Sequence, residues 1–190
     1  MRREIIISGF GGQGIVLTGQ LLAGAATFEG RNVVWSPSHG PEMRGGESNC
    51  TVVVADRPIG SPVVAHPDTA IIMDRPSLVR LSGVIASDGL MMINSSLAPS
   101  GPRRRDLRVW KVPANHLAEE IGDVRVANII MLGAFIEAEH LVSPESVKQA
   151  LRDRLPHRRR QLLELNERAL ERGMRHVREA GDKGVAAGAR

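Results

Sequence analysis

The stretch "REIIISGFGGQGIVLTGQLLAGAATFEG", residues 3–30, determines the fold class of this chain. It opens with a short apolar run typical of a buried strand and passes through a tight glycine turn. Apolar residues then recur at three- and four-residue spacing, which predicts a helix that ends near Gly30. "NVVWS", residues 32–36, is the next predicted strand, so the first 36 residues are expected to form a βαβ unit.

The rest of the chain continues this alternation of strands and helices. Further strands are expected at 49–55, 69–74, 89–97 and 107–114, and helices at 75–85, 116–122, 125–141 and 157–180, with a helix start at Ser143 and Pro144. We therefore predict an α/β fold, a Rossmann-like and mainly parallel sheet flanked by helices, with a C-terminal helical segment. Residues 1–180 are expected to form one domain, with antiparallel strands added around 47–65 and a disordered tail at 181–190.

Composition indicates a soluble cytoplasmic protein. Of the 190 residues, 42% are hydrophobic and 24% charged, and no apolar run approaches the roughly 20 residues of a membrane helix. The formal net charge of +4 comes with only 3% aromatic residues and no tyrosine, so we expect no nucleic-acid partner. The arginines at 103–108 are read as a solvated loop, with a docking surface for an acidic partner as the alternative.

Gly9, Gly11 and Gly14 form a G-x-G-x-x-G pattern between a strand and a helix, the context of a dinucleotide-binding turn. Backbone N–H groups there can approach an anion. A NAD site also needs an acidic residue at the end of the second strand, where this chain has Trp35 and Ser36. NAD is therefore not expected, and a tight crossing without any ligand remains an alternative.

The loop "SPSHGPEMRGGESNC", residues 36–50, is unusually rich in glycine for a connection between two strands. In an open α/β sheet, ligands meet the loops that follow the carboxyl ends of the strands. The surface predicted there has backbone donors and one guanidinium, which suits phosphate. Its members, taken as candidate ligand-binding residues, are Gly11, Gly12, Gln13, Gly14, Ser38, His39, Arg44, Gly45, Gly46, Asn49, Asn94 and Ser95.

This surface does not predict self-contained catalysis. His39 and Glu42 share the loop, but the sequence has no serine in an elbow motif and no His/Asp/Glu cluster with metal-ligand spacing. We expect no catalytic residue and no metal ligand in this chain. Met43 is expected to be a contact residue for a partner subunit.

Five segments together carry a family resemblance. They are "GFGGQG", "GPEMRGGESNCTVVVADRPIGSPVV", "INSSL", "VPANHLAEEIG" and "RVANIIMLGAF", in that order. In these segments the chain closely resembles the gamma subunit of 2-oxoacid:ferredoxin oxidoreductases, from about residue 4 to about residue 172. The "GPEMRGGESNC" block is far more specific than the glycine turn.

The resemblance implies a non-catalytic subunit of an enzyme that oxidatively decarboxylates a 2-oxoacid to an acyl-CoA and reduces ferredoxin. Thiamine diphosphate, Mg and iron–sulfur clusters would be bound by partner subunits and none by this chain, whereas coenzyme A, as substrate, would occupy a shared site. The expected partners are the alpha and beta subunits, a delta subunit as a further candidate, and ferredoxin through the complex. Among pyruvate, branched-chain and other 2-oxoacids, 2-oxoglutarate is favoured.

On this basis, residues 11–14 and 41–46 would face the catalytic subunits and coenzyme A. Arg44 is assigned either to a phosphate of coenzyme A or to a carboxylate of a partner subunit. Two alternatives stay open: a purely structural assembly subunit without ligand contact, and a stand-alone nucleotide-binding Rossmann protein.

Overall fold

The computed structural model of the protein describes residues 1–39, 46–154, 160–181 and 185–187, with only the backbone of residues 39, 160 and 185–187. The strands are β1 (Arg2–Phe10), β2 (Asn32–His39), β3 (Glu47–Ala55), β4 (Thr69–Ile72), β5 (Leu90–Asn94), β6 (Arg108–Val112) and β7 (Val185–Ala187). The helices are α1 (Ile15–Phe28), α2 (Arg75–Leu81), α3 (Ala114–Glu120), α4 (Ala127–Glu139), α5 (Pro144–Arg154) and α6 (Arg160–Ala180), with a 3₁₀ turn η1 (Val124–Val126) before α4.

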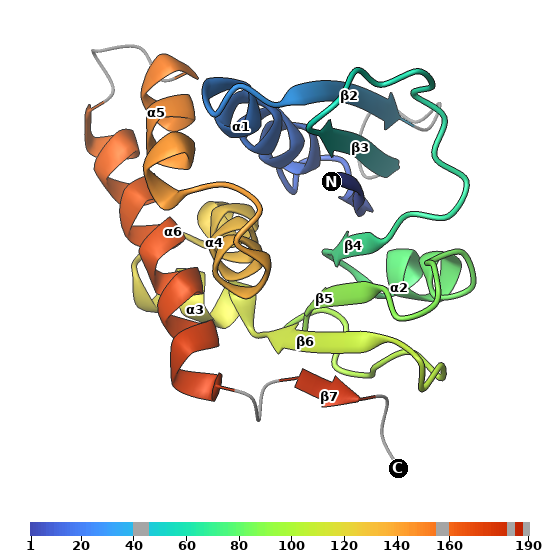
Figure 1. The fold of residues 1–190 in the computed structure, drawn as a ribbon. Helices are drawn as coiled ribbons and strands as arrows, with labels where there is room; N and C mark the ends of the chain where they lie inside the picture. The colour runs from blue at the N-terminus through green and yellow to red at the C-terminus, as the bar shows by residue number, and fades with distance from the viewer. Residues whose placement is uncertain (40–45, 155–159, 182–184, 188–190) are drawn as a thin grey trace.

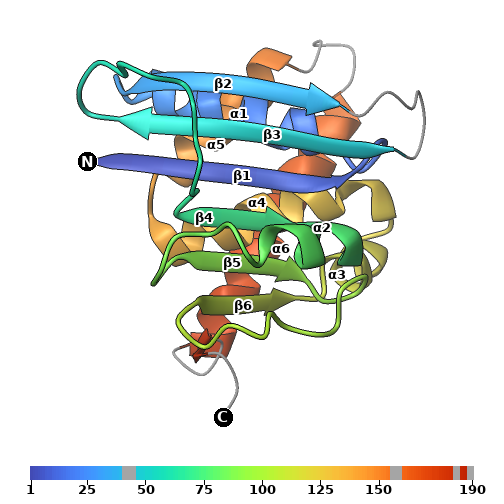
Figure 2. The ribbon, with the colours of Figure 1, turned by 90° about the vertical axis from the view of Figure 1, so that its right-hand side faces the viewer.

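The described strands form one mixed sheet in the order β2-β3-β1-β4-β5-β6-β7. Strands β1, β4, β5 and β6 pair in parallel, whereas β3 pairs antiparallel with both β1 and β2, and β7 antiparallel with β6. Five strands, including β2, therefore run in the same direction, as Figure 2 shows. The predicted α/β fold with a flanked sheet and a C-terminal helix is confirmed.

The first βαβ unit differs from the expectation in one respect. β1 and β2 run in the same direction, but β3 lies between them and pairs with each along most of its length. A hairpin connection is shorter than a crossover, so the strand that follows β2 folds back beside it and fills the gap next to β1. The antiparallel strand predicted around 47–65 is thus β3, which ends at Ala55.

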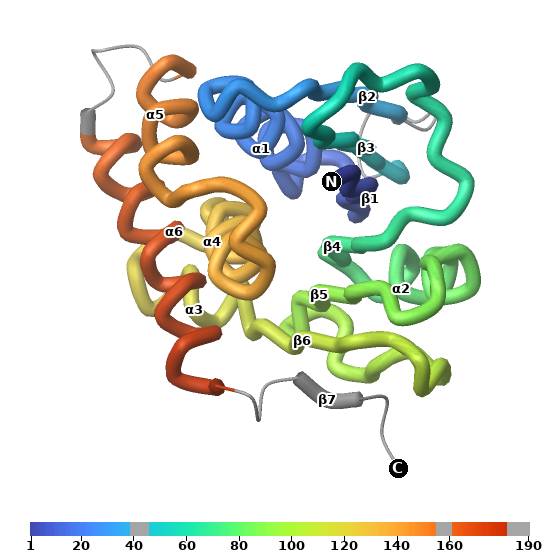
Figure 3. Tube along the Cα trace, viewed as in Figure 1, coloured from blue at the N-terminus to red at the C-terminus, as the bar shows by residue number. Residues whose placement is uncertain are grey.

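Helices cover the two faces of the sheet unequally. Helices α1, α3, α4, α5 and α6 lie on one face, and α2 lies on the other beside β4 and β5 (Figures 1 and 3). Side chains alternate accordingly along β1: Ile5 and Ile7 belong to the larger core under α1 and α4, while Ile6 packs against the smaller core under α2. The change of side between α1 and α2 occurs where β1 neighbours β4.

Helix α4 is the centre of the larger core. Its residues Ala127–Ile136 are all buried, in agreement with its nearly continuous apolar sequence. It meets α6 backbone to backbone, because a Cβ atom at Gly133 would lie 2.1 Å from the carbonyl oxygen of Leu170, and one at Gly173 would lie 2.0 Å from that of Ile130. The two glycines therefore set how closely α4 and α6 approach.

Two helix termini follow the predicted signals, whereas α2 ends at Leu81 and α4 at Glu139, before the predicted ends at 85 and 141. Gly30, with a φ of +73°, follows the end of α1, and α5 begins at Pro144 with the Ser143 hydroxyl accepting a hydrogen bond from the Ser146 N–H at 3.2 Å. Within the predicted disordered tail, residues 185–187 instead form β7, and 182–184 and 188–190 lie outside the described residues. Within the described ranges, no helix has the length and apolar character to cross a bilayer.

Candidate functional site

The candidate site lies at the edge of the sheet where β1, β2, β4, β5 and β6 end. The glycine turn follows β1, residues 73–74 follow β4, and residues 95–97 follow β5 (Figure 2). β3 starts at this same edge because it runs in the opposite direction. The glycine turn, both ends of the 36–50 loop and the "NSS" segment therefore share one edge, as the sequence predicted.

The glycine turn is held by the Gln13 side chain, which bonds both to the turn itself and to Met73, the residue that follows β4. The Phe10 N–H donates to Gln13 Oε1 at 2.9 Å, and Gln13 Nε2 donates to the carbonyl oxygen of Met73 at 3.4 Å. Gly12 has a φ of +105° and is exposed, and a Cβ atom there would meet nothing within 4 Å. Gln13 thus fixes the conformation of the turn, while the space next to Gly12 is open to solvent.

A backbone hydrogen bond joins the turn to the end of the 36–50 loop. The Gly11 N–H donates to the carbonyl oxygen of Gly46 at 2.8 Å. Next to this bond, Ser38 of β2, Asn49 of β3 and Ser8 of β1 lie in register across three strands. Arg44 and Gly45, together with the Pro41–Met43 part of the predicted block, lie outside the described residues, as does the side chain of His39.

Asn94 and Ser95 reach the same edge but are used differently. Asn94 is fully buried, its Nδ2 donates to Asn115 Oδ1 at 2.8 Å, and its Oδ1 accepts from the Ala114 N–H at 3.2 Å. The Ser95 N–H donates to the carbonyl oxygen of Val112 at 2.9 Å. Asn94 thus holds the start of α3 against β5, and because it is buried it supports the site without being part of its surface.

The third glycine of the turn is a packing residue. Gly14 precedes α1 with a φ of +75°, and a Cβ atom there would lie 2.4 Å from Nδ2 of the buried Asn128 on α4. The close approach of α1 and α4 at this point requires glycine. Asn128 was not singled out by the sequence reasoning, although it lies in the "RVANIIMLGAF" segment that carries the resemblance.

A network of polar side chains at this edge was also missed. Arg80 of α2 donates from Nη2 to Ser8 Oγ at 2.7 Å and to Asn49 Oδ1 at 3.0 Å, and its Nη2 lies 3.0 Å from Glu47 Oε1. Ser8 Oγ also lies 2.9 Å from Ser77 Oγ of α2. The "D-x-x-S" spacing of Asp74 and Ser77 could have indicated the start of α2, because the Asp74 side chain accepts from the Ser77 N–H at 2.9 Å. No local pattern indicates that Arg80 reaches across to β3.

A groove of about 430 Å³ opens beside this network. It lies where β1 neighbours β4 and the flanking helices change sides of the sheet, which is the position where ligands bind in open α/β folds. Phe10 and Leu97 are exposed at it, with 40% and 38% of their surfaces accessible. Its lining residues are Gly9, Phe10, Glu47, Asp74, Arg75, Pro76, Ser77, Arg80 and Leu97.

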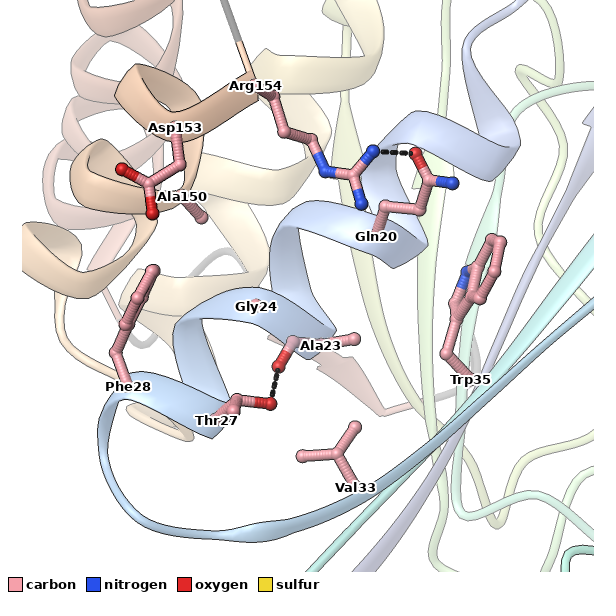
Figure 4. Close-up of a pocket in the computed structure, with 10 residues that line it drawn as sticks. All are labelled: Gln20, Ala23, Gly24, Thr27, Phe28, Val33, Trp35, Ala150, Asp153 and Arg154. Atoms are coloured by element: carbon pink, nitrogen blue, oxygen red, sulfur yellow. Dashed lines mark hydrogen bonds between the residues drawn. The ribbon is translucent and has the colours of Figure 1, made fainter.

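A larger hollow of about 650 Å³ lies elsewhere, between α1, β2 and α5. Figure 4 shows that Val33 and Trp35 of β2 face the α1 side chains there, while Arg154 of α5 donates to Gln20 Oε1 at 2.6 Å. Neither hollow is lined by a residue predicted from the sequence as a site, but the smaller groove adjoins them: Phe10 and Glu47 are the neighbours of Gly11 and Gly46, and Arg80 binds Asn49. We place the candidate site in the smaller groove at the carboxyl edge.

The cysteine has no site chemistry of its own. Cys50 of β3 is buried against α1, where burial raises the pKa of its thiol to about 11, and the neighbouring Trp35 indole N–H only partly offsets this rise. The thiol is thus protonated at neutral pH and is a poor ligand or nucleophile. Within the part of the chain that the structure describes, no three His, Cys, Asp or Glu side chains come together in a way that could hold a metal ion.

Comparison with known proteins identifies the family. A family model described as pyruvate ferredoxin/flavodoxin oxidoreductase matches residues 4–176. The chain belongs to this family. It is a gamma subunit of a 2-oxoacid:ferredoxin oxidoreductase, and the other subunits of that enzyme are its partners.

Relatives of this gamma subunit carry several substrate names. The 2-oxoglutarate synthase subunit KorC of Methanocaldococcus jannaschii is 38% identical, with 82% of this chain and 85% of that protein covered. The ketoisovalerate oxidoreductase subunit VorA of Methanothermobacter thermautotrophicus is 37% identical over 93% of this chain, which spans 36% of VorA. The resemblance stated from the sequence is confirmed.

Solved structures agree with the fold of this gamma subunit. The keto/oxoacid ferredoxin oxidoreductase gamma subunit of Geobacter sulfurreducens matches with a TM-score of 0.78 and 30% identity, covering 91% of this chain and 96% of that one. A 2-oxoglutarate:ferredoxin oxidoreductase from Magnetococcus marinus, solved with 2-oxoglutarate, coenzyme A and succinyl-CoA, matches with a TM-score of 0.84 over 93% of this chain and 31% of its own. At 19% identity, the second likeness concerns the fold alone.

Proposed function

We propose that this gamma subunit positions coenzyme A at the carboxyl edge of its sheet and helps to assemble the oxidoreductase, without breaking bonds itself. The observation that carries the proposal is the hydrogen bond of 2.8 Å from the Gly11 N–H to the Gly46 carbonyl oxygen, which joins the glycine turn to the end of the 36–50 loop. Phe10, directly before Gly11, and Glu47, directly after Gly46, line the groove of about 430 Å³. Holding a substrate in place raises its rate of reaction through orientation.

The side chains at this edge fit binding better than catalysis. The polar groups of Ser8, Asn49 and Arg80 hydrogen-bond one another instead of forming a nucleophile and base pair. The exposed Phe10 and Leu97 give the edge an apolar rim of the kind found at protein interfaces and around ligands. A partner subunit and coenzyme A could therefore meet at the same place.

The remaining cofactors are proposed to belong to partner subunits. Iron–sulfur clusters are held by several thiolates, and this chain has one cysteine, which is buried and protonated. Thiamine diphosphate with Mg is assigned to the partners on the family resemblance. We propose 2-oxoglutarate as the 2-oxoacid because the KorC relative is 38% identical, although VorA follows at 37%. Initial rates of the purified complex with 2-oxoglutarate, 2-oxoisovalerate and pyruvate test this choice.

Hydrogen exchange of the anaerobically purified complex tests the proposal for coenzyme A. With coenzyme A added, amides in peptides that cover residues 9–14 and 46–49 should exchange more slowly, whereas peptides from α6 should be unchanged. If hydrogen exchange is unchanged in both residues 9–14 and residues 46–49, this edge of the sheet serves assembly of the complex and not binding of coenzyme A. The Arg44→Ala variant separates the two roles: a raised KM for coenzyme A in an intact complex supports ligand contact, and dissociation of the complex supports an assembly contact.

A further inference from the structure

The Arg80 guanidinium is bound in a way that allows one of its acceptors to be replaced by another. Its Nη2 atom carries two hydrogens but has three acceptors within 3.0 Å, namely Ser8 Oγ, Asn49 Oδ1 and Glu47 Oε1. One acceptor is therefore in excess. Glu47 Oε1 also accepts from Asn49 Nδ2 at 2.5 Å, so this carboxylate keeps a partner if Arg80 turns to another anion.

Arg80 also has donors to spare. In the described part of the chain, its Nε and Nη1 meet no hydrogen-bond acceptor, although the side chain lines the groove and is 37% exposed. Three N–H bonds are thus available at the groove, and an oxygen that replaces Glu47 on Nη2 can pair with a second one on Nε or Nη1, the paired geometry that fits a phosphate. Glu47, at 44% exposure, is the solvated member of the pair and can move away.

The surroundings favour a phosphate that is attached to a planar ring. Arg75 is a second arginine that lines the same groove, and the Asp74 carboxylate accepts a hydrogen bond from the Ser77 N–H at 2.9 Å. Phe10 and Leu97 offer exposed apolar surface on which a base can stack. Once the Glu47 carboxylate has moved away, the groove is lined by two arginines, Arg75 and Arg80, and by one carboxylate, Asp74, which is already hydrogen-bonded. This balance of charge attracts a ligand that carries several negative charges.

We propose that Arg80 is a phosphate-binding residue for the nucleotide end of coenzyme A, and that Glu47 occupies its place while the groove is empty. The inference rests on the proposed function, because it assigns a part of the same ligand. The phosphate exchanges with an internal carboxylate, so binding weakens the Arg80–Glu47 bond between α2 and β3. Glu47 directly follows Gly46, the acceptor of the Gly11 N–H, so the exchange takes place next to the glycine turn.

The test uses the assembled, anaerobically purified complex carrying Arg80→Gln, Glu47→Gln or both, with adenosine 3′,5′-bisphosphate as the probe. Arg80→Gln should raise the inhibition constant of the bisphosphate about tenfold or more, the loss expected for a charge-assisted pair of hydrogen bonds. Glu47→Gln should lower it severalfold, because the competing carboxylate is gone. In the double variant the Glu47 effect should disappear, which shows that it acts through Arg80.

Pantetheine, which has no phosphate, distinguishes this assignment from a general effect on the site. The inhibition constant of pantetheine should be the same in all variants. As a matched control, Arg178→Gln removes the ion pair of 2.8 Å between Arg178 of α6 and Glu137 of α4, and it should change the inhibition constant of neither pantetheine nor the bisphosphate. The proposed exchange of Glu47 for phosphate would be wrong if Arg80→Gln and Glu47→Gln changed the inhibition constant of the bisphosphate in the same direction and by the same factor. It would also be wrong if the inhibition constant of pantetheine changed as much as that of the bisphosphate. If coenzyme A protects neither residues 9–14 nor residues 46–49 in the wild-type complex, the proposed coenzyme A role itself fails. If Arg80→Gln assembles poorly, Arg80→Lys, which keeps the charge but lacks the planar fork, should still raise the inhibition constant of the bisphosphate above that of wild type.

Discussion

The side-chain amide of Asn128 donates to the carbonyl oxygen of Gly14 at 3.3 Å, across 114 residues of sequence. The same Nδ2 atom lies 3.2 Å from Thr18 Oγ1 on the next turn of α1. These contacts join the start of α1 to the start of α4 beneath the glycine turn. The last glycine of the motif thus serves the packing of two helices, whereas Gly12 faces open space.

Gly14→Ala should therefore destabilise the fold. The new Cβ atom would lie 2.4 Å from Asn128 Nδ2, and the φ of +75° disfavours any L side chain. Strain and overpacking together should lower the free energy of unfolding by about 2 kcal/mol or more. Thermal and urea unfolding measure this, with Gly12→Ala as the matched control, since it carries the strain without the collision. Equal losses in the two variants would contradict a packing role for Gly14.

Gly12→Val should strain the backbone, because the φ of this position is +105°, and should lower turnover further than Gly12→Ala, which carries the strain with a smaller side chain. The position is exposed, with nothing within 4 Å of a Cβ atom, so the branched side chain would project in front of the turn. Misplacing a ligand by about 1 Å can cost up to about a hundredfold in rate, so we expect at least about a tenfold loss of coenzyme A-dependent turnover. Turnover by the complex and its melting temperature are the two readouts. Wild-type turnover would show that nothing approaches the turn closely.

Gly173→Ala should loosen the C-terminal helix. A Cβ atom at this position would lie 2.0 Å from the Ile130 carbonyl oxygen, so α6 would have to move away from α4. Overpacking of this kind typically costs about 1–3 kcal/mol. Gly24→Ala on α1 is the control, because its Cβ atom would make an ordinary contact of 3.4 Å with Ala150 and alanine favours a helix. Denaturant unfolding should place the two variants on opposite sides of wild type.

Cys50 should resist thiol reagents in the native state. With a pKa of about 11, on the order of a thousandth of the thiol is ionised at pH 8, and the sulfur is fully buried. Labelling with a disulfide reagent should therefore be slow until urea unfolds the chain, and its rate should then rise to that of a free thiol. Rapid labelling without urea would mean that β2 opens away from α1.

Glu29→Gln should remove part of the acid sensitivity of the fold. Burial alone would raise the pKa of this carboxyl, but hydrogen bonds from the Ser143 N–H at 2.6 Å and from the hydroxyls of Ser146 and Ser143 lower it overall. A lowered pKa stabilises the fold above the ordinary pKa of glutamate, and this stabilisation is lost as the pH falls through the lowered value.

The variant should consequently be less stable than wild type by about 1 kcal/mol at pH 7, a modest figure because the carboxylate is partly solvated. The difference should shrink as the pH falls below the ordinary pKa of glutamate and through the lowered pKa of Glu29, because the wild-type carboxylate is progressively protonated there. Melting temperatures of both proteins at pH 7 and pH 3.5 check this, with Glu179→Gln on the exposed side of α6 as the control. A difference that does not depend on pH would assign the effect to packing.

The sequence was most informative where a signal is local. The glycine turn, the end of α1 at Gly30 and the start of α5 at Pro144 are each specified by residues within a few positions of one another. The place of β3 between β1 and β2 was not readable, because pairing partners on a sheet are chosen by long-range packing.

The candidate site divides in the same way. Gly11, Gly46, Ser38 and Asn49 come together as predicted from the ends of their strands. Arg80 reaches Glu47 across the sequence from a helix that the pattern placed only approximately, and no spacing rule links them. Asn94 was chosen for its loop position, yet burial makes it a support for α3, a distinction that requires the packed structure.

The antiparallel pairing of β2 with β3 has a consequence for how the chain can vary. His39 and Ser48 are partners in register, so the chain leaves the sheet and re-enters it at adjacent points, with residues 40–47 between them. A hairpin needs only about two to five residues to close. The sheet therefore does not dictate the length of the segment 40–45, whereas Gly46 and Glu47, which contact Gly11 and Arg80, belong to the scaffold.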